Sequence, residues 1–231
     1  MQRHHIFVTG ATGYLGRPLV TELLARGHTV RALVRPGAVS RLPSGASPVI
    51  GDALAASSFA GAVAPADTIV HLVGTPRPNP AKAAQFRAVD LVSIEATVHA
   101  AQVGRVRHLV YVSVAHPAPI MRAYIAVREA GEGLIRASGV AATILRPWYI
   151  LGPGHRWPYV LLPIYALLSW LPRTREGARR LGLVTREQMI RALIHAVEHP
   201  ASGVRVVEVP EIRSGALLDP VSTHRGTSAN A

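Results

Sequence analysis

The chain has 231 residues, of which 49% are hydrophobic and 16% charged. This composition excludes an intrinsically disordered protein, and the absence of cysteine excludes disulfides, thiolate metal ligands and thiol nucleophiles. The formal net charge of +12 suggests nucleic-acid binding, but the basic residues are scattered along the chain and Lys82 is the only lysine. A phosphate-binding surface would cluster its cations, so we expect no nucleic-acid partner.

The N-terminal residues MQRHH are not followed by an apolar stretch of signal-peptide length. The longest uncharged apolar segment, residues 157–172, contains Pro158 and Pro163. It is also shorter than the about 20 residues that a membrane span needs. We therefore expect a cytoplasmic protein.

Predicted strands and helices alternate along the chain. The expected strands are residues 6–8, 29–34, 49–50, 68–73, 109–112, 142–145 and 204–209. Helical periodicity begins near Leu15, covers about residues 82–102 and 124–138, and returns after a T-x-x-Q capping box formed by Thr185 and Gln188. This alternation is typical of parallel strands joined by crossover helices, so the fold class is α/β with a doubly wound parallel sheet.

No linker divides the chain. We expect one nucleotide-binding domain over residues 1–213, a lid or substrate-side segment over residues 147–183, and a disordered, small and polar tail over residues 214–231.

A glycine-rich turn, VTGATGYLG at residues 8–16, joins the first predicted strand to the first predicted helix. Glycines at such a junction permit a tight turn, close approach of the backbone to a pyrophosphate, and close packing of helix on strand. The helix N-terminus adds oriented N–H donors. In this context the pattern favours a dinucleotide-binding site over an ordinary glycine-rich turn.

The end of the second strand favours NADP(H). An NAD(H) site usually places an acidic residue there to hold the ribose hydroxyls, but no acidic residue lies between Glu22 and Asp52. The strand instead ends in Arg35, with Arg31 four residues earlier, and a guanidinium can pair with a 2′-phosphate. We predict NADP(H), with NAD(H) as the alternative cofactor. Arg35 is otherwise a solvated loop arginine in an arginine-rich chain.

Several residues at other strand ends are also candidates for cofactor binding. Asp52 either accepts a hydrogen bond from an adenine amino group or caps the segment that begins at Ala53. Gly74 would let the backbone pass near the diphosphate, whereas His71, inside the fourth strand, is interpreted as a core histidine. The strand-end residues expected at the cofactor are Asp52, Leu72, Val73, Gly74, Val112 and Pro147.

Ser113, Tyr124 and Arg128 form the candidate catalytic set. Ser113 ends the fifth strand, and a four-residue spacing puts Tyr124 and Arg128 on one face of the next helix. Ser113 would hold a carbonyl oxygen while Tyr124 gives or takes its proton in the field of Arg128, and hydride moves to or from a nicotinamide. The alternative is a surface arginine stacked on a partly buried tyrosine.

All three tryptophans lie between residues 147 and 172, after the sixth strand. The aromatic side chains Trp148, Tyr149 and Trp157 are expected to contact an apolar or aromatic substrate, because ligands of open α/β sheets bind beyond the carboxyl ends of the strands. Two alternatives are a packed lid helix and a helix lying on a membrane surface. We expect no metal site.

Six segments together resemble the atypical short-chain dehydrogenases/reductases, most of all their NmrA-like members and the Rossmann-fold accessory subunit of respiratory complex I. They are TGATGYLG, HTVRALVR, the GD after the third strand, YVS, the helix of Tyr124, and LRPWYILGPG. The resemblance covers about residues 5–210 and implies a Rossmann-like sheet.

The resemblance also implies site residues. NADP(H) would be held by Gly10, Thr12, Gly13, Tyr14 and Leu15, with Arg35 at the 2′-phosphate, and Ser113 and Tyr124 would be the catalytic serine and tyrosine. The family's enzymes carry Tyr-x-x-x-Lys, whereas this chain has Arg128 in place of the lysine. Two hypotheses follow: an NADP(H)-dependent oxidoreductase acting on a small apolar carbonyl-type substrate, or a non-catalytic NADP(H)-binding protein for redox sensing or assembly.

Overall fold

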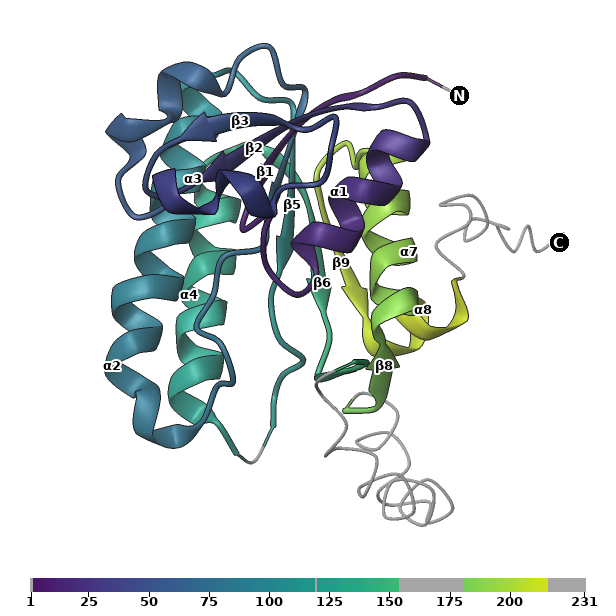
Figure 1. Ribbon diagram of the computed structural model, residues 1–231. Helices are drawn as coiled ribbons and strands as arrows, with labels where there is room; N and C mark the ends of the chain where they lie inside the picture. Colours follow the sequence, from purple (N-terminus) through teal and green to yellow (C-terminus); the bar gives the residue numbers. More distant parts are fainter. Residues whose placement is uncertain (1, 119, 154–180, 216–231) are drawn as a thin grey trace, which may run out of the picture.

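The computed structural model describes residues 2–118, 120–153 and 181–215 (Figure 1). Within these residues, seven parallel strands form one sheet in the order β3-β2-β1-β4-β5-β6-β9. The strands are β1 (His5–Thr9), β2 (Thr29–Val34), β3 (Ser47–Ile50), β4 (Thr68–His71), β5 (His108–Val112), β6 (Ala141–Arg146) and β9 (Val204–Glu208). This architecture confirms the α/β, Rossmann-like fold.

Helices cover both faces of the sheet (Figure 1). The helices on one face are α1 (Gly16–Ala25), α7 (Arg186–Glu198) and α8 (Val209–Ser214), and those on the other are α2 (Ala83–Gln85), α3 (Val92–Val103) and α4 (Arg122–Ala137). A π-helical segment, Phe86–Leu91, joins α2 to α3. Short 3₁₀ helices occur at Pro36–Arg41, Ala56–Ser58, Ala60–Ala62 and Pro80–Lys82.

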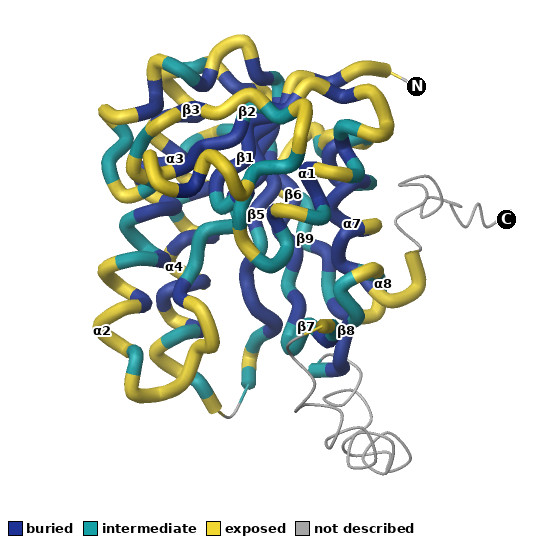
Figure 2. Tube along the Cα trace, viewed as in Figure 1, coloured by how far each residue is buried: buried dark blue, intermediate teal, exposed yellow. Residues whose placement is uncertain are grey.

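The sheet is the most deeply buried layer of the molecule (Figure 2). One hydrophobic core packs between the sheet and the helices α1, α7 and α8, and a second packs between the sheet and the helices α3 and α4. The buried strands are nearly continuous apolar runs because both of their faces are covered. The order of the strands reverses between β1 and β4, so the carboxyl ends of these two strands open a crevice at that edge.

Most predicted elements are present within a few residues. The capping box of α7 is confirmed, because Gln188 N donates to Thr185 Oγ1 at 3.2 Å and Thr185 N donates to Gln188 Oε1 at 2.8 Å. The prediction of strand from residue 68 to 73 is too long, since β4 ends at His71 and the chain then turns over the glycine turn, with Leu72 N donating to Thr9 O at 3.2 Å.

The sequence did not predict a short parallel pair, β7 (Tyr149–Leu151) with β8 (Leu183–Thr185), or the helix α8. The expected tail begins inside α8, and its residues 216–231 lie outside the described part of the chain, as do residues 154–180 of the expected lid. Across the described ranges, none of the helices is long and apolar enough to cross a bilayer.

Candidate nucleotide-binding and catalytic site

The turn between β1 and α1 has room only for glycine at two of its positions. Gly10 has φ of +73°, and a Cβ there would lie 2.8 Å from both the carbonyl carbon and the oxygen of Leu72. A Cβ on Gly16 would collide with the carbonyl oxygen of Gly10. Gly13 N donates to Gly10 O at 3.0 Å and closes the turn. The N-terminus of α1 therefore follows directly on the turn, which is the arrangement that binds a diphosphate.

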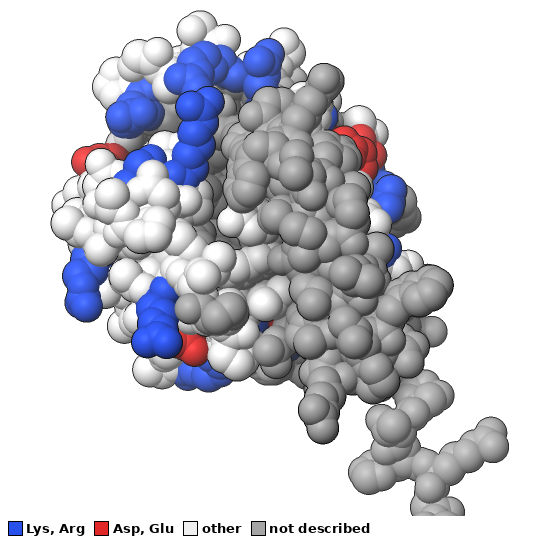
Figure 3. All heavy atoms as spheres, turned by 90° about the horizontal axis from the view of Figure 1, so that it is seen from below, with Lys and Arg blue, Asp and Glu red and all other residues white. Residues whose placement is uncertain are grey.

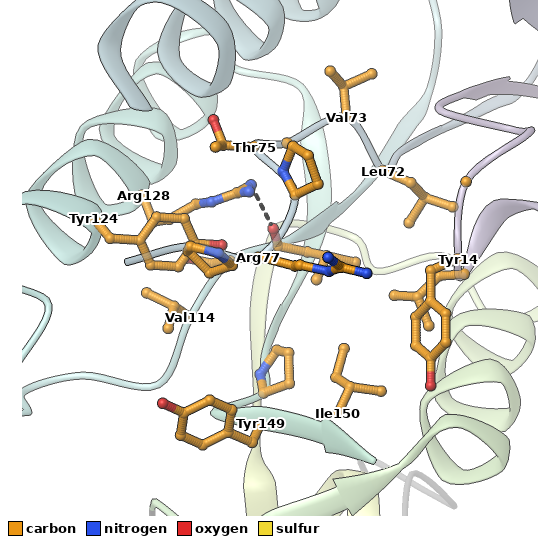
Figure 4. Close-up of a pocket in the computed structure, with 18 of the residues that line it drawn as sticks. Tyr14, Leu72, Val73, Thr75, Arg77, Val114, Tyr124, Arg128, Tyr149 and Ile150 are labelled. Carbon is orange, nitrogen blue, oxygen red and sulfur yellow. Dashed lines mark hydrogen bonds between the residues drawn. The ribbon is translucent and has the colours of Figure 1, made fainter. Parts of the chain in front are cut away.

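A cavity of about 510 Å³ lies beside this turn at the carboxyl edge of the sheet. It is lined by Gly13, Tyr14, Leu15, Leu72, Val73, Gly74, Thr75, Pro76, Arg77, Pro78, Val112, Ser113, Val114, Tyr124, Arg128, Pro147, Trp148, Tyr149 and Ile150. The structure thus brings most of the predicted site residues together around one opening (Figure 4).

Four predicted cofactor residues do not line this cavity: Gly10, Thr12, Arg35 and Asp52. Trp157 lies outside the described residues. Arg35 follows β2 and is exposed, and within the described residues its side chain has no hydrogen bond or ion pair. Its neighbour Arg31 instead donates to the carbonyl oxygen of Ala64 at 2.6 Å.

Asp52 has a local structural role in this conformation. Its Oδ1 accepts a hydrogen bond of 3.0 Å from Leu54 N, and Ser58 Oγ bridges its backbone N and O. The carboxylate therefore caps the turn that leads into the 3₁₀ helix Ala56–Ser58, as in the capping interpretation, although no α-helix follows.

Arg128 is buried, with an exposed fraction of 6%, and so is not the surface arginine of the alternative interpretation. Its Nη2 lies 2.6 Å from Asp90 Oδ1, its Nη1 donates to Val112 O at 3.0 Å, and its guanidinium lies 5.1 Å from the centre of the Tyr124 ring. Burial lowers the pKa of Arg128, but Tyr124, Tyr111 and Asp90 outweigh burial and raise it above the ordinary value. The guanidinium is therefore always charged beneath the tyrosine.

Asp90, which was not among the predicted site residues, supplies the negative charge that balances the buried Arg128 guanidinium. It is fully buried, and its Oδ2 accepts hydrogen bonds from Thr75 N at 3.0 Å and Thr75 Oγ1 at 2.6 Å. A Cβ on Gly74 would collide with Arg128 Nη2, so Gly74 leaves room for the ion pair. The only sequence signal was a single acid inside the apolar run at residues 88–94.

Ser113 donates its hydroxyl proton to Glu132 Oε1 at 2.7 Å. Glu132 is almost fully buried, and Arg146 Nε donates to the same oxygen at 2.9 Å. Burial raises the pKa of Glu132, but hydrogen bonds from Arg146 and Ser113 outweigh it and lower the pKa to about 2. Glu132 is thus an ionised carboxylate that accepts the hydroxyl proton of Ser113. The Ser113 oxygen can still accept a hydrogen bond from a molecule in the cavity that this residue lines.

Aromatic rings form the remaining walls. The centres of the Tyr124 and Phe86 rings lie 4.9 Å apart, and Trp148 and Tyr149 meet edge to face with ring centres 5.5 Å apart. Tyr149 lies below Tyr124 in the view of Figure 4. His71 lies beneath the site and is fully buried, with Nδ1 at 2.9 Å from Thr97 Oγ1. Burial and, to a lesser extent, Arg128 lower the pKa of His71 to about 3, so it is a neutral core histidine as predicted.

The comparisons with known proteins identify an NAD(P)H-binding protein. Residues 10–161 match the NAD(P)H-binding family model, and the chain belongs to that family. It is 28% identical over 210 residues to the ceramide reductase of Caulobacter vibrioides, covering 90% of this chain and 65% of that protein. It is 30% identical over 227 residues to a 3-diazoavenalumate denitrifying reductase of Streptomyces, covering 86% of this chain and 73% of that protein.

Among solved structures, the Bordetella bronchiseptica enzyme WbmH in complex with NAD+ has the same fold, with a TM-score of 0.66 at 21% identity over 88% of this chain and 75% of that chain. The family match confirms the predicted resemblance to NAD(P)-binding short-chain dehydrogenases/reductases. The described residues fit a nicotinamide dinucleotide. The turn has no room for a side chain at Gly10 and Gly16, and the crevice beside it is mostly apolar.

Proposed function

We propose that this chain is an NADP(H)-dependent oxidoreductase that acts on an apolar substrate with a carbonyl-type group. The observation that carries the proposal is the position of Tyr124, which lines the same cavity as the glycine turn and rests on a charged, buried Arg128. A bound nicotinamide would supply or accept the hydride. The relatives in Caulobacter and Streptomyces carry the names of reductases, which supports the same class of reaction.

In this proposal Tyr124 transfers a proton to or from the substrate oxygen. The Arg128 guanidinium, 5.1 Å from the ring, would stabilise the negative charge that develops on the phenol oxygen as the proton leaves. Ser113 would contact the same substrate oxygen and, because its own proton goes to Glu132, would accept a hydrogen bond from a substrate hydroxyl. Such a contact would orient the alcohol form of the substrate.

The choice of NADP(H) rests on Arg35. An exposed arginine at the end of β2, whose side chain has no partner among the described residues, can pair with a 2′-phosphate in a bidentate geometry. The cofactor would lie along Gly10, Thr12, Gly13, Tyr14 and Leu15, with its nicotinamide end near Val112 and Pro147. Trp148 and Tyr149 would form the apolar wall for the substrate.

The variant Tyr124→Phe tests this proposal. We expect NADPH oxidation with a panel of aldehydes and ketones to fall by about a hundredfold or more, as for loss of a general acid. The dissociation constant for NADPH should stay the same, because the phenol oxygen is assigned to the substrate. Circular dichroism and the NADPH titration serve as folding controls. Full activity in Tyr124→Phe would show that Tyr124 has no catalytic role.

A second candidate is a non-catalytic NADP(H)-binding protein. It is favoured by the hydrogen bonds of Ser113 and Arg128, which are directed to Glu132, Asp90 and a backbone carbonyl rather than to the cavity. This function predicts saturable NADPH binding by the wild-type protein with no oxidation by any carbonyl of the panel. Turnover of one carbonyl that is lost in Tyr124→Phe would exclude it.

A further inference from the structure

Arg77 is a cation of the cavity that neither the dinucleotide turn nor the catalytic set uses. It belongs to the loop after β4, lines the cavity, and its side chain extends over the opening toward Tyr14 (Figure 4). It is exposed, and no hydrogen bond or ion pair joins it to any described residue. An arginine that projects over an apolar opening, with no partner in the described part of the chain, can offer its five donors to a ligand.

The backbone at Arg77 is strained in a way that fixes this position. Arg77 has φ of +48°, an uncommon value for a residue with a side chain, and it lies between Pro76 and Pro78. The two residues before Arg77 are anchored: Lys82 Nζ donates to Pro76 O at 2.6 Å, and Thr75 donates two hydrogen bonds to the buried Asp90. The loop thus holds the arginine at the opening with little freedom of its backbone.

Arg77 also dominates the charge of the cavity. The described lining includes two arginines and no acidic residue, and the charge of Arg128 is balanced by Asp90. On the described part of the face seen from below in Figure 3, Lys and Arg side chains are more prominent than Asp and Glu. A ligand with an apolar body and one negative group would match this opening in both polarity and charge.

From these observations we infer that Arg77 forms an anion subsite for the substrate, which would carry a carboxylate or phosphate group on its apolar body. The planar guanidinium binds the paired oxygens of such groups in a bidentate manner. The inference rests on the proposed function, because it places the substrate in the cavity beside Tyr124. The other source of the same chemistry is a phosphate of the dinucleotide, and the experiment separates the two.

The first pair of probes is para-carboxybenzaldehyde and its uncharged methyl ester. The further pairs are likewise an aldehyde with a carboxylate and its methyl ester, with an alkyl or a cinnamyl body in place of the benzene ring. Binding is measured by calorimetry in the presence of NADP+, so that no turnover intervenes, and NADPH oxidation is measured separately. The variants are Arg77→Ala, Arg77→Lys and the control Arg105→Ala. Arg105 is matched to Arg77 because it is exposed and has φ of +51°, but it precedes β5 at the opposite edge of the sheet.

We expect the wild-type protein to bind the acid of at least one pair about tenfold more tightly than its ester, as for a charge-assisted hydrogen bond. This preference should disappear in Arg77→Ala, return in part in Arg77→Lys, remain in Arg105→Ala, and weaken as salt is added. The dissociation constant of NADPH should not change in Arg77→Ala.

Equal binding of acid and ester in every pair, binding of no pair, or an acid preference that survives in Arg77→Ala would overturn the inference. So would a loss of NADPH affinity in Arg77→Ala with an unchanged ratio of acid to ester, which would assign Arg77 to the dinucleotide. Acid binding that depends on Arg77, without NADPH oxidation by any aldehyde, would retain the subsite and refute the proposed reaction instead.

Discussion

The ion pair between Asp90 and Arg128 can be tested as a stabilising element through Asp90→Asn, which keeps the size of the side chain and removes its charge. Asp90 is fully buried and accepts three hydrogen bonds, one of them from Arg128 at 2.6 Å. The variant leaves a buried guanidinium without a counter-charge, and such a loss costs about 3–5 kcal/mol. For a chain of this length that corresponds to a fall in melting temperature of about 6–20 °C.

The assay is urea unfolding followed by tryptophan fluorescence, with the slope of the transition checked for constancy. The matched control is Glu22→Gln, which removes a half-exposed carboxylate 3.3 Å from Arg26 and should cost less than about 1 kcal/mol. The double variant Asp90→Asn with Arg128→Met should be more stable than Asp90→Asn alone, because no unpaired charge is left in the interior. A loss in Asp90→Asn no larger than that in Glu22→Gln would refute the account of this pair.

Three further predictions concern the turn, the carboxylate behind Ser113 and the core histidine. Gly10→Ala should abolish NADPH binding or lower the melting temperature measurably, because its Cβ would lie 2.8 Å from the Leu72 carbonyl. Unchanged NADPH binding together with an unchanged melting temperature would contradict this. Because the pKa of Glu132 is lowered from 4.5 to about 2, it adds stability above pH 4.5 that is lost as pH falls toward 2, so acid titration should show a flatter profile in Glu132→Gln. The pKa of His71 is lowered from 6.5 to about 3, so as pH falls below 6.5 the unfolded state takes up a proton before the folded state does, and this residue lowers the stability of the fold. The NMR signals of His71 in the folded protein should be those of a neutral imidazole at pH 5. A titration midpoint of His71 near pH 6.5 would contradict this.

The fold was predictable from the sequence because parallel strands that are covered on both faces consist of short apolar runs between turn residues. The helix α7 was equally clear from its capping box. The predicted strand extended too far past the end of β4 because residues 72–73 are apolar like the strand itself. In the structure these two residues line the cavity and are not part of the sheet. The pair β7–β8 has strands of three residues, which is too short for any periodicity to show.

The site was predictable only in part. The turn residues and Tyr124 follow from local patterns, so their shared cavity was expected. The partners Asp90 and Glu132 lie 38 and 19 residues from Arg128 and Ser113, and nothing in the spacing shows that these side chains meet. An acid on a helix is usually solvated, so burial, which gives these two their roles, becomes visible only in three dimensions.

The binding of NADP(H) at the glycine turn and Arg35 is tested by titrating the nucleotide-free protein with NADPH and with NADH, in the wild type and in Arg35→Ala. Nucleotide fluorescence reports the binding. We expect saturable binding with a clear preference for NADPH that is lost in Arg35→Ala. Equal binding of the two nucleotides by the wild type would remove Arg35 from the site, and binding of neither would contradict the central claim that the turn at residues 10–16 holds a nicotinamide dinucleotide.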